Sequence, residues 1–152
     1  MRVETIEDVL KWTALFHQNL KNRLNKASEQ NDQERARMFL DYLADHESTL
    51  ECQIREFIKR SDEKALSTLV YDYLDNHSIL EHGHSDSPFK EQSLEYITGE
   101  TVDLHEQVLE LYSHLYGRVD TDSAEELLTE VRDLEENEIK RMVQTGNRAS
   151  DL

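Results

Sequence analysis

The sequence predicts an all-α fold, in which four main helices and a shorter helical connector pack as a bundle. One proline and four glycines in 152 residues leave few positions that would interrupt a helix. Apolar residues recur every three or four positions over long stretches, as they do on the buried face of an amphipathic helix. With 37% hydrophobic residues the chain can bury a core, so we expect one domain over residues 1–146 and a polar tail over 147–152.

Five helices are predicted in chain order, at about residues 5–27, 32–60, 62–76, 88–116 and 122–145. The first begins after Thr5, whose hydroxyl can cap it together with Asp8 three residues on. The second is expected to be capped by Asn31 or Asp32. Both carry apolar residues spaced by alternating threes and fours, which predicts one buried face on each helix.

The connector is predicted from apolar residues that fall on one side of a short helix. These residues are Leu66, Leu69, Val70, Tyr73 and Leu74. A polar loop follows, and Ser87-Pro88 then predicts a helix start, with the serine as cap and the proline at the first position. This helix either runs unbroken to Tyr116 or breaks near Thr98-Gly99.

The last helix is bounded by capping residues at both ends. Asp122 is expected to begin it, with Glu125 completing a capping box. Gly146 suits a helix end and is expected to close it before the polar tail.

The charge and the amino terminus narrow the range of partners and compartments. A formal charge of −16 argues against nucleic acid and anionic membranes as partners, whereas it could attract cations or a basic protein. Residues 1–10 lack the basic start and apolar run of a signal peptide, and no apolar stretch is long enough to span a bilayer. The single Cys52 cannot form an intramolecular disulfide, so we expect a reducing, cytoplasmic setting.

An internal repeat with an offset of 88 residues places polar side chains on the buried faces of the four main helices. His17 and Glu47 recur as His105 and Glu135. Each of them interrupts an apolar stripe, and burying such groups costs several kcal/mol unless partners satisfy them. The repeat therefore predicts that the four side chains meet in one layer of the bundle. Glu138, one turn beyond Glu135, is expected to point into the same space.

Two imidazoles with two or three carboxylates form a suitable ligand set for iron, manganese or zinc. The residues predict a metal site made by His17, Glu47, His105 and Glu135, with Glu138 as a candidate fifth ligand. The alternative is a metal-free cluster, in which protonated histidines pair with the glutamates and fix the register of the helices. The residue types leave both interpretations open.

Three segments resemble the motif-bearing helices of the ferritin-like superfamily, nearest to the rubrerythrin-type bundles. They are residues 40–47, 109–112 and 128–135. The resemblance covers about Glu4 to Gln144 and implies an antiparallel four-helix bundle with a helical crossover connector. In that family each of two helix hairpins supplies a Glu from its first helix and a Glu-x-x-His from its second, and together these hold two iron ions.

The chain departs from the family pattern on both hairpins. Glu47 and Glu135 match the glutamates of the two Glu-x-x-His motifs. His17 and His105 stand where the family has the other Glu, and the motif histidines are replaced by Leu50 and Glu138. The resemblance therefore implies a degenerate di-iron motif, with a single-metal or a vestigial site, and it implies no particular enzyme activity.

A non-catalytic function is the second hypothesis. In it the bundle is an interaction or scaffold protein with a vestigial, metal-free polar core. Its acidic surface or the 66–74 segment would contact a protein partner or a second copy in a homodimer. The histidines of the polar loop, with Glu81 beside them, are interpreted as solvated residues, Cys52 as a bystander, and Tyr112 and Trp12 as core.

Overall fold

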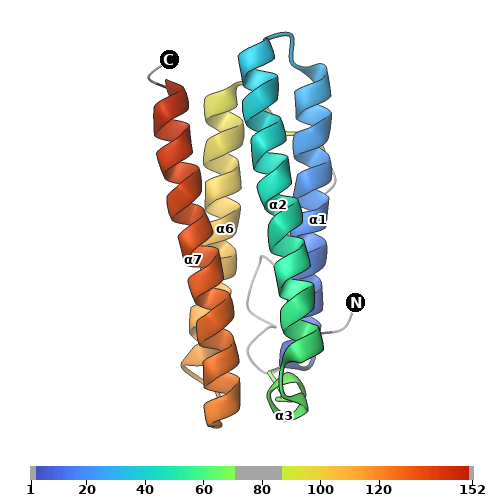
Figure 1. Cartoon of the computed structure of the whole chain (residues 1–152), viewed down its shortest axis with the longest axis vertical. Helices are drawn as coiled ribbons and strands as arrows, with labels where there is room; N and C mark the ends of the chain where they lie inside the picture. The colour runs from blue at the N-terminus through green and yellow to red at the C-terminus, as the bar shows by residue number, and fades with distance from the viewer. Residues whose placement is uncertain (1–2, 71–86, 151–152) are drawn as a thin grey trace.

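The computed structural model describes residues 3–70 and 87–150 and confirms the all-α prediction. No strand occurs within these ranges. Their helices are α1 (Ile6–Gln30), α2 (Glu34–Arg60), α3 (Glu63–Leu66), α6 (Leu94–Tyr116) and α7 (Asp122–Ser150). The four long helices lie side by side as a helical bundle, and the chain runs in opposite directions along α1 and α2 and along α6 and α7 (Figure 1).

The first two helices begin and end close to the predicted positions. Asp8 N–H donates to Thr5 Oγ1 at 3.2 Å and Thr5 N–H donates to Asp8 Oδ2 at 3.2 Å, which is the predicted capping box. The cap of α2 differs from the prediction. It is Gln33, whose side chain makes no capping bond, and Asn31 Oδ1 instead accepts from Gln33 N–H in the turn.

The connector helix is much shorter than predicted. α3 ends at Leu66, because the chain then becomes extended and pairs with the segment before α1. Ile6 N–H donates to the Thr68 carbonyl at 3.0 Å, and Val70 N–H donates to the Glu4 carbonyl at 2.8 Å. The rest of the predicted 62–76 helix, from residue 71, lies outside the described residues.

The helix predicted at 88–116 begins six residues later than expected. Its cap is Ser93, whose Oγ accepts from Tyr96 N–H at 3.2 Å, and it runs without a break to Tyr116. The Ser87-Pro88 segment packs against α1 instead of starting a helix. There Phe89 is buried under the Arg23 guanidinium, and Arg23 Nε donates to the Ser87 carbonyl at 2.9 Å.

The last helix is longer than predicted at its carboxyl end. It continues past Gly146 to Ser150, so most of the predicted 147–152 tail is helical. A Cβ at Gly146 would lie 3.3 Å from Thr98 Cγ2, so the glycine permits close packing on α6 and does not end the helix. At the other end, Thr121 Oγ1 accepts from Ala124 N–H, which replaces the predicted Asp122 and Glu125 capping box.

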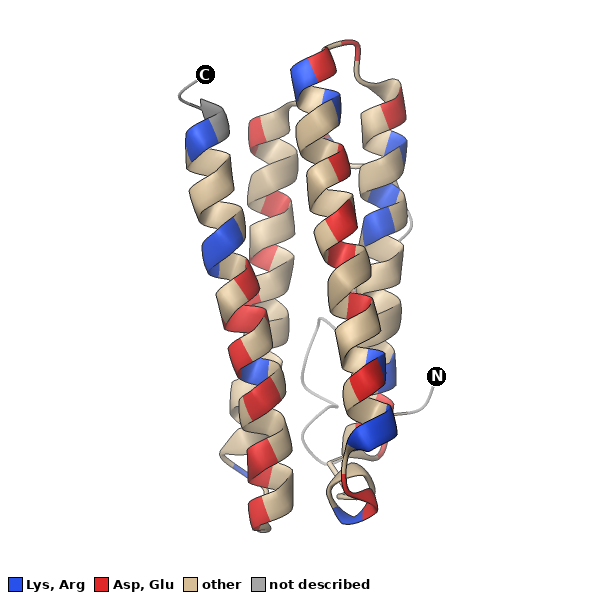
Figure 2. Ribbon diagram, in the orientation of Figure 1, with Lys and Arg blue, Asp and Glu red and all other residues tan. Residues whose placement is uncertain are grey.

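The charge pattern of α7 supports its length. Apart from Arg132, the charged side chains of α7 are acidic from Asp122 to Glu138 and basic from Lys140 to Arg148, which suits the helix dipole (Figure 2). Among the described residues, no helix is both long and apolar enough to cross a membrane.

Candidate metal centre

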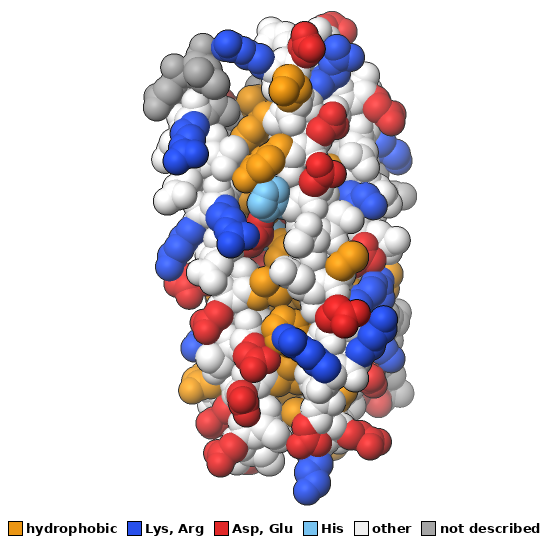
Figure 3. All heavy atoms as spheres, in the orientation of Figure 1, with side chains coloured by type: hydrophobic (Ala, Val, Ile, Leu, Met, Phe, Trp, Pro, Cys, Tyr) orange, Lys and Arg blue, Asp and Glu red, His pale blue; other side chains and the backbone are white. Residues whose placement is uncertain are grey.

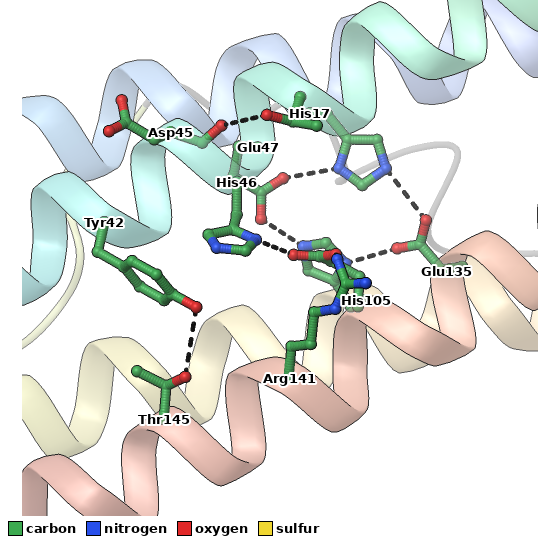
Figure 4. A network of polar contacts seen from close by, with 11 residues as sticks. His17, Tyr42, Asp45, His46, Glu47, His105, Glu135, Arg141 and Thr145 are labelled. Atoms are coloured by element: carbon green, nitrogen blue, oxygen red, sulfur yellow. Dashed lines mark hydrogen bonds and ion pairs between the residues drawn. The ribbon is translucent and has the colours of Figure 1, made fainter.

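Four side chains from the four long helices meet in one fully buried cluster, which we call the tetrad. It consists of His17 on α1, Glu47 on α2, His105 on α6 and Glu135 on α7, each with 0% exposure (Figure 4). The two imidazole centroids lie 5.0 Å apart. The structure thus brings together the residues that the 88-residue repeat relates.

The contacts of the tetrad form a closed ring in which every imidazole touches both carboxylates. Within each hairpin, His17 Nδ1 lies 2.7 Å from Glu47 Oε2, and His105 Nδ1 lies 2.5 Å from Glu135 Oε1. Between the hairpins, His17 Nε2 lies 3.3 Å from Glu135 Oε2, and His105 Nε2 contacts Glu47 Oε1. Each histidine therefore uses Nδ1 within its own hairpin and Nε2 across to the other, so the sequence repeat is also a repeat of contacts.

The two carboxylates differ in hydrogen bonding, because the geometry of the contacts is suitable at Glu47 and unsuitable at Glu135. Both oxygens of Glu47 are hydrogen-bonded, one to His17 Nδ1 and one to His105 Nε2. The atoms on the other side have no hydrogen bond of acceptable direction, although they lie close to one another. These atoms are His17 Nε2, His105 Nδ1 and both oxygens of Glu135. The Glu135 half is thus the unsatisfied half of a buried site.

Electrostatics favours the charged form of every member of the tetrad. Burial lowers the pKa of His17, but the carboxylates of Glu135 and Glu47 outweigh it and raise that pKa to about 9. The same carboxylates raise the pKa of His105 against its burial. Burial acts in the opposite direction on Glu135, but the two imidazoles lower its pKa to about 2 and also lower that of Glu47. Two imidazolium and two carboxylate groups give a neutral ring.

Apolar and aromatic side chains enclose the tetrad. The ring of Phe16 packs in a T-shaped arrangement with both imidazoles, with ring centroids at 5.2 Å from His17 and 6.4 Å from His105. The Tyr112 hydroxyl donates to Thr13 Oγ1 at 2.7 Å, and burial followed by the charge of Glu135 raises its pKa. Tyr112 is therefore a core residue with a satisfied hydroxyl, as predicted, and Trp12 is buried as well.

Glu138 belongs to a second polar contact beside the tetrad. Its carboxylate is held by His46 Nδ1 of α2, and Arg141 Nη1 lies 3.5 Å from its other oxygen. Glu138, which was expected to point into the space of the tetrad, pairs with His46 beside it, and the sequence indicated no role for His46. The sequence contained a signal for this pair. The repeat-related residues, 88 positions away, are Leu134 and Leu50, so His46 and Glu138 are both polar where the repeat has leucine.

The sequence offered two further candidates, Cys52 and the cluster of the polar loop. Cys52 is a free, exposed cysteine, and its assignment as a bystander stays a prediction. The loop cluster of His77, Glu81, His82 and His84 lies outside the described residues.

Comparisons with known proteins return no family model, no curated protein and no solved structure that matches this chain. Evidence for a function therefore comes from the site itself. Among the described residues, His17, His105 and Glu135 could hold a metal ion, because each offers a ligand atom and these atoms all lie within 4.8 Å of one another.

Proposed function

We propose that this protein is a ferritin-like antiparallel four-helix bundle that binds one metal ion in its core. The ligands are His17 Nε2, His105 Nδ1 and the Glu135 carboxylate. The observation that carries the proposal is the unsatisfied half of the tetrad, where these buried atoms converge in ion-pair contact but make no hydrogen bond of acceptable direction. Buried polar atoms in folded proteins nearly always have a partner, and a cation is a suitable partner for this set.

Glu47 supports the proposal by fixing the tautomers of both histidines. Its two oxygens accept from His17 Nδ1 and His105 Nε2, so the remaining ring nitrogens carry lone pairs when the imidazoles are neutral. Carboxylates that orient ligating histidines in this way are common around protein metal sites. We therefore assign Glu47 the role of orienting the two histidines, whereas the sequence predicted it as a metal ligand.

The spacing of His17 Nε2 and Glu135 Oε2 agrees with shared coordination. Two ligand atoms about 2.1 Å from a tetrahedral ion are about 3.4 Å apart, and His17 Nε2 lies 3.3 Å from Glu135 Oε2. The 2.5 Å between His105 Nδ1 and Glu135 Oε1 would lengthen when an ion enters. Two nitrogens and a carboxylate suit iron, manganese or zinc.

A bound ion would connect the two hairpins. Its ligands come from α1, α6 and α7, and Glu47 adds α2 through hydrogen bonds. Anything that binds the folded state and not the unfolded state raises stability by mass action. The proposed role of the ion is therefore to stabilise the packing of the two hairpins, and we assign no enzyme activity.

A second candidate is the metal-free scaffold, and the neutral ring of charges favours it. With both imidazoles protonated, four N–H groups face four carboxylate oxygens. The bundle would then present its surface to a protein partner or a second copy, which stay predictions.

Elemental analysis distinguishes the two candidates. Protein purified without chelator is expected to contain close to one iron, manganese or zinc ion per chain. Glu135→Gln should lose the ion, and Glu47→Gln should bind it about 10-fold to 100-fold more weakly. Glu130→Gln, an exposed position on the same helix, is the matched control and should bind like the wild type. Wild-type protein that holds no ion after reconstitution with all three metals contradicts the proposal and leaves the scaffold.

A further inference from the structure

A polar pair occupies the seam between α2 and α7 at the edge of the tetrad. The side chain of His46 is 22% exposed and that of Glu138 is 6% exposed, so the pair extends from solvent into the bundle. Figure 3 shows a histidine at the surface of this seam, in a row of apolar side chains and beside basic ones. His46 adjoins Glu47 in the chain, and Glu138 lies one helical turn after Glu135, so the pair and the tetrad are neighbours.

Packing alone does not require this pair. The repeat-related positions carry Leu134 and Leu50, so the bundle fills the equivalent places with apolar side chains. Leu50 is fully buried. The polar pair thus occurs on one side of the tetrad. On the other side the repeat-related positions carry leucines, so the helix packing does not need polar side chains there.

We propose that His46 and Glu138 form the entry gate through which a divalent cation reaches the buried site. This inference rests on the proposed function. An ion entering a closed core must exchange its water ligands for protein ligands, and an imidazole nitrogen and a carboxylate are suitable first replacements. Glu138 then passes the ion inward to Glu135, one turn away on the same face of α7.

Arg141 acts as a removable cover on this gate. Its side chain is 65% exposed and lies 3.5 Å from the Glu138 carboxylate, so an incoming cation competes with a weak, solvent-screened contact. The ring of Tyr42 covers His46 from the other side, with centroids 4.3 Å apart, and its hydroxyl lies 3.4 Å from Thr145 Oγ1 (Figure 4). Gate opening therefore requires side-chain movement and leaves the helices in place.

The test compares the rate of metal exchange with the amount of metal held. The main variant combines His46→Leu with Glu138→Leu and so copies the leucines of the repeat-related positions. Wild type and variant are unfolded in chelator and refolded with Zn²⁺, which fills the site without use of the gate. Release of Zn²⁺ into a colorimetric chelator is then followed.

The gate predicts that both proteins hold the same amount of Zn²⁺ after refolding and that the variant releases it at least about tenfold more slowly. Arg141→Ala should release Zn²⁺ faster than the wild type. Glu138→Gln should slow release, whereas Glu136→Gln, an exposed change of equal charge on the same helix, should not.

Equal release rates in wild type and the leucine variant overturn the gate. A leucine variant that holds less Zn²⁺ than the wild type also overturns it, because the pair would then be part of the site. If the wild type itself holds no Zn²⁺, the proposed function has failed.

Discussion

The tetrad and the His46–Glu138 pair are neighbours, but they differ in their relation to the repeat, in burial and in charge. The tetrad obeys the repeat, is fully buried and balances two positive against two negative groups. The pair departs from the repeat, reaches solvent and contacts the exposed Arg141. The repeat thus identifies what both hairpins must supply to the core, and the departure from it identifies what only one side of the bundle does.

The strongest test of this contrast removes the two histidines of the tetrad. Replacing His17 and His105 with leucine leaves Glu47 and Glu135 buried without a cation. The expected loss is about 3–5 kcal/mol, measured by denaturant unfolding with chelator present. Replacing all four members with leucine removes the charges together and should be neutral or stabilising by about 1–4 kcal/mol. A double-leucine variant as stable as the wild type would show that the carboxylates do not depend on the imidazoles.

The dependence of stability on pH should be nearly as large. In metal-free protein the pKa of His17 is about 9 against 6.5 for an ordinary histidine, so its stabilising effect is complete below about pH 6.5 and is lost as pH rises through 9. Glu135, with a pKa of about 2 against 4.5, stabilises fully above pH 4.5 and loses its effect as pH falls through 2.

The difference in unfolding free energy between wild type and the four-leucine variant should therefore be greatest between about pH 4.5 and 6.5. The expected decrease toward pH 9 is on the order of 3 kcal/mol. Loading with metal should remove the decrease on the alkaline side, because the ion replaces protons on the imidazoles. A difference that stays constant with pH would contradict the assigned charges.

The pair should affect stability least. His46→Leu with Glu138→Leu exchanges a partly exposed contact for apolar side chains, and we expect a change within about 1 kcal/mol in chelator. Thermal unfolding monitored by circular dichroism measures it. A loss as large as that of the histidine double variant would make the pair a structural element equal to the tetrad.

The sequence was sufficient for the parts of the structure that depend on local patterns. The all-α class and the ends of α1 and α2 follow from apolar spacing and from the Thr5 capping box. The tetrad follows because a polar residue on a buried face requires a partner, and a repeat supplies four of them at one depth. These features depend on spacing within the chain.

The features that were missed depend on contacts between distant segments. α3 stops at Leu66 because Thr68 and Val70 pair with the chain before α1, and α6 starts late because Phe89 packs beneath Arg23. His46 lies at the edge of the buried face of α2, where polar side chains are common, so its position in the sequence does not indicate a site. The different roles of Glu47 and Glu135 depend on the direction of individual hydrogen bonds, which residue types do not specify.

Calorimetric titration of metal-free protein with Zn²⁺ at pH 7, in buffers of different ionisation enthalpy, tests the central claim most directly. The proposal predicts one ion per chain and the release of about two protons, one from each imidazole, because Glu47 keeps the other ring proton of each in place. Absence of binding, or binding without proton release, would contradict a site formed by His17, His105 and Glu135.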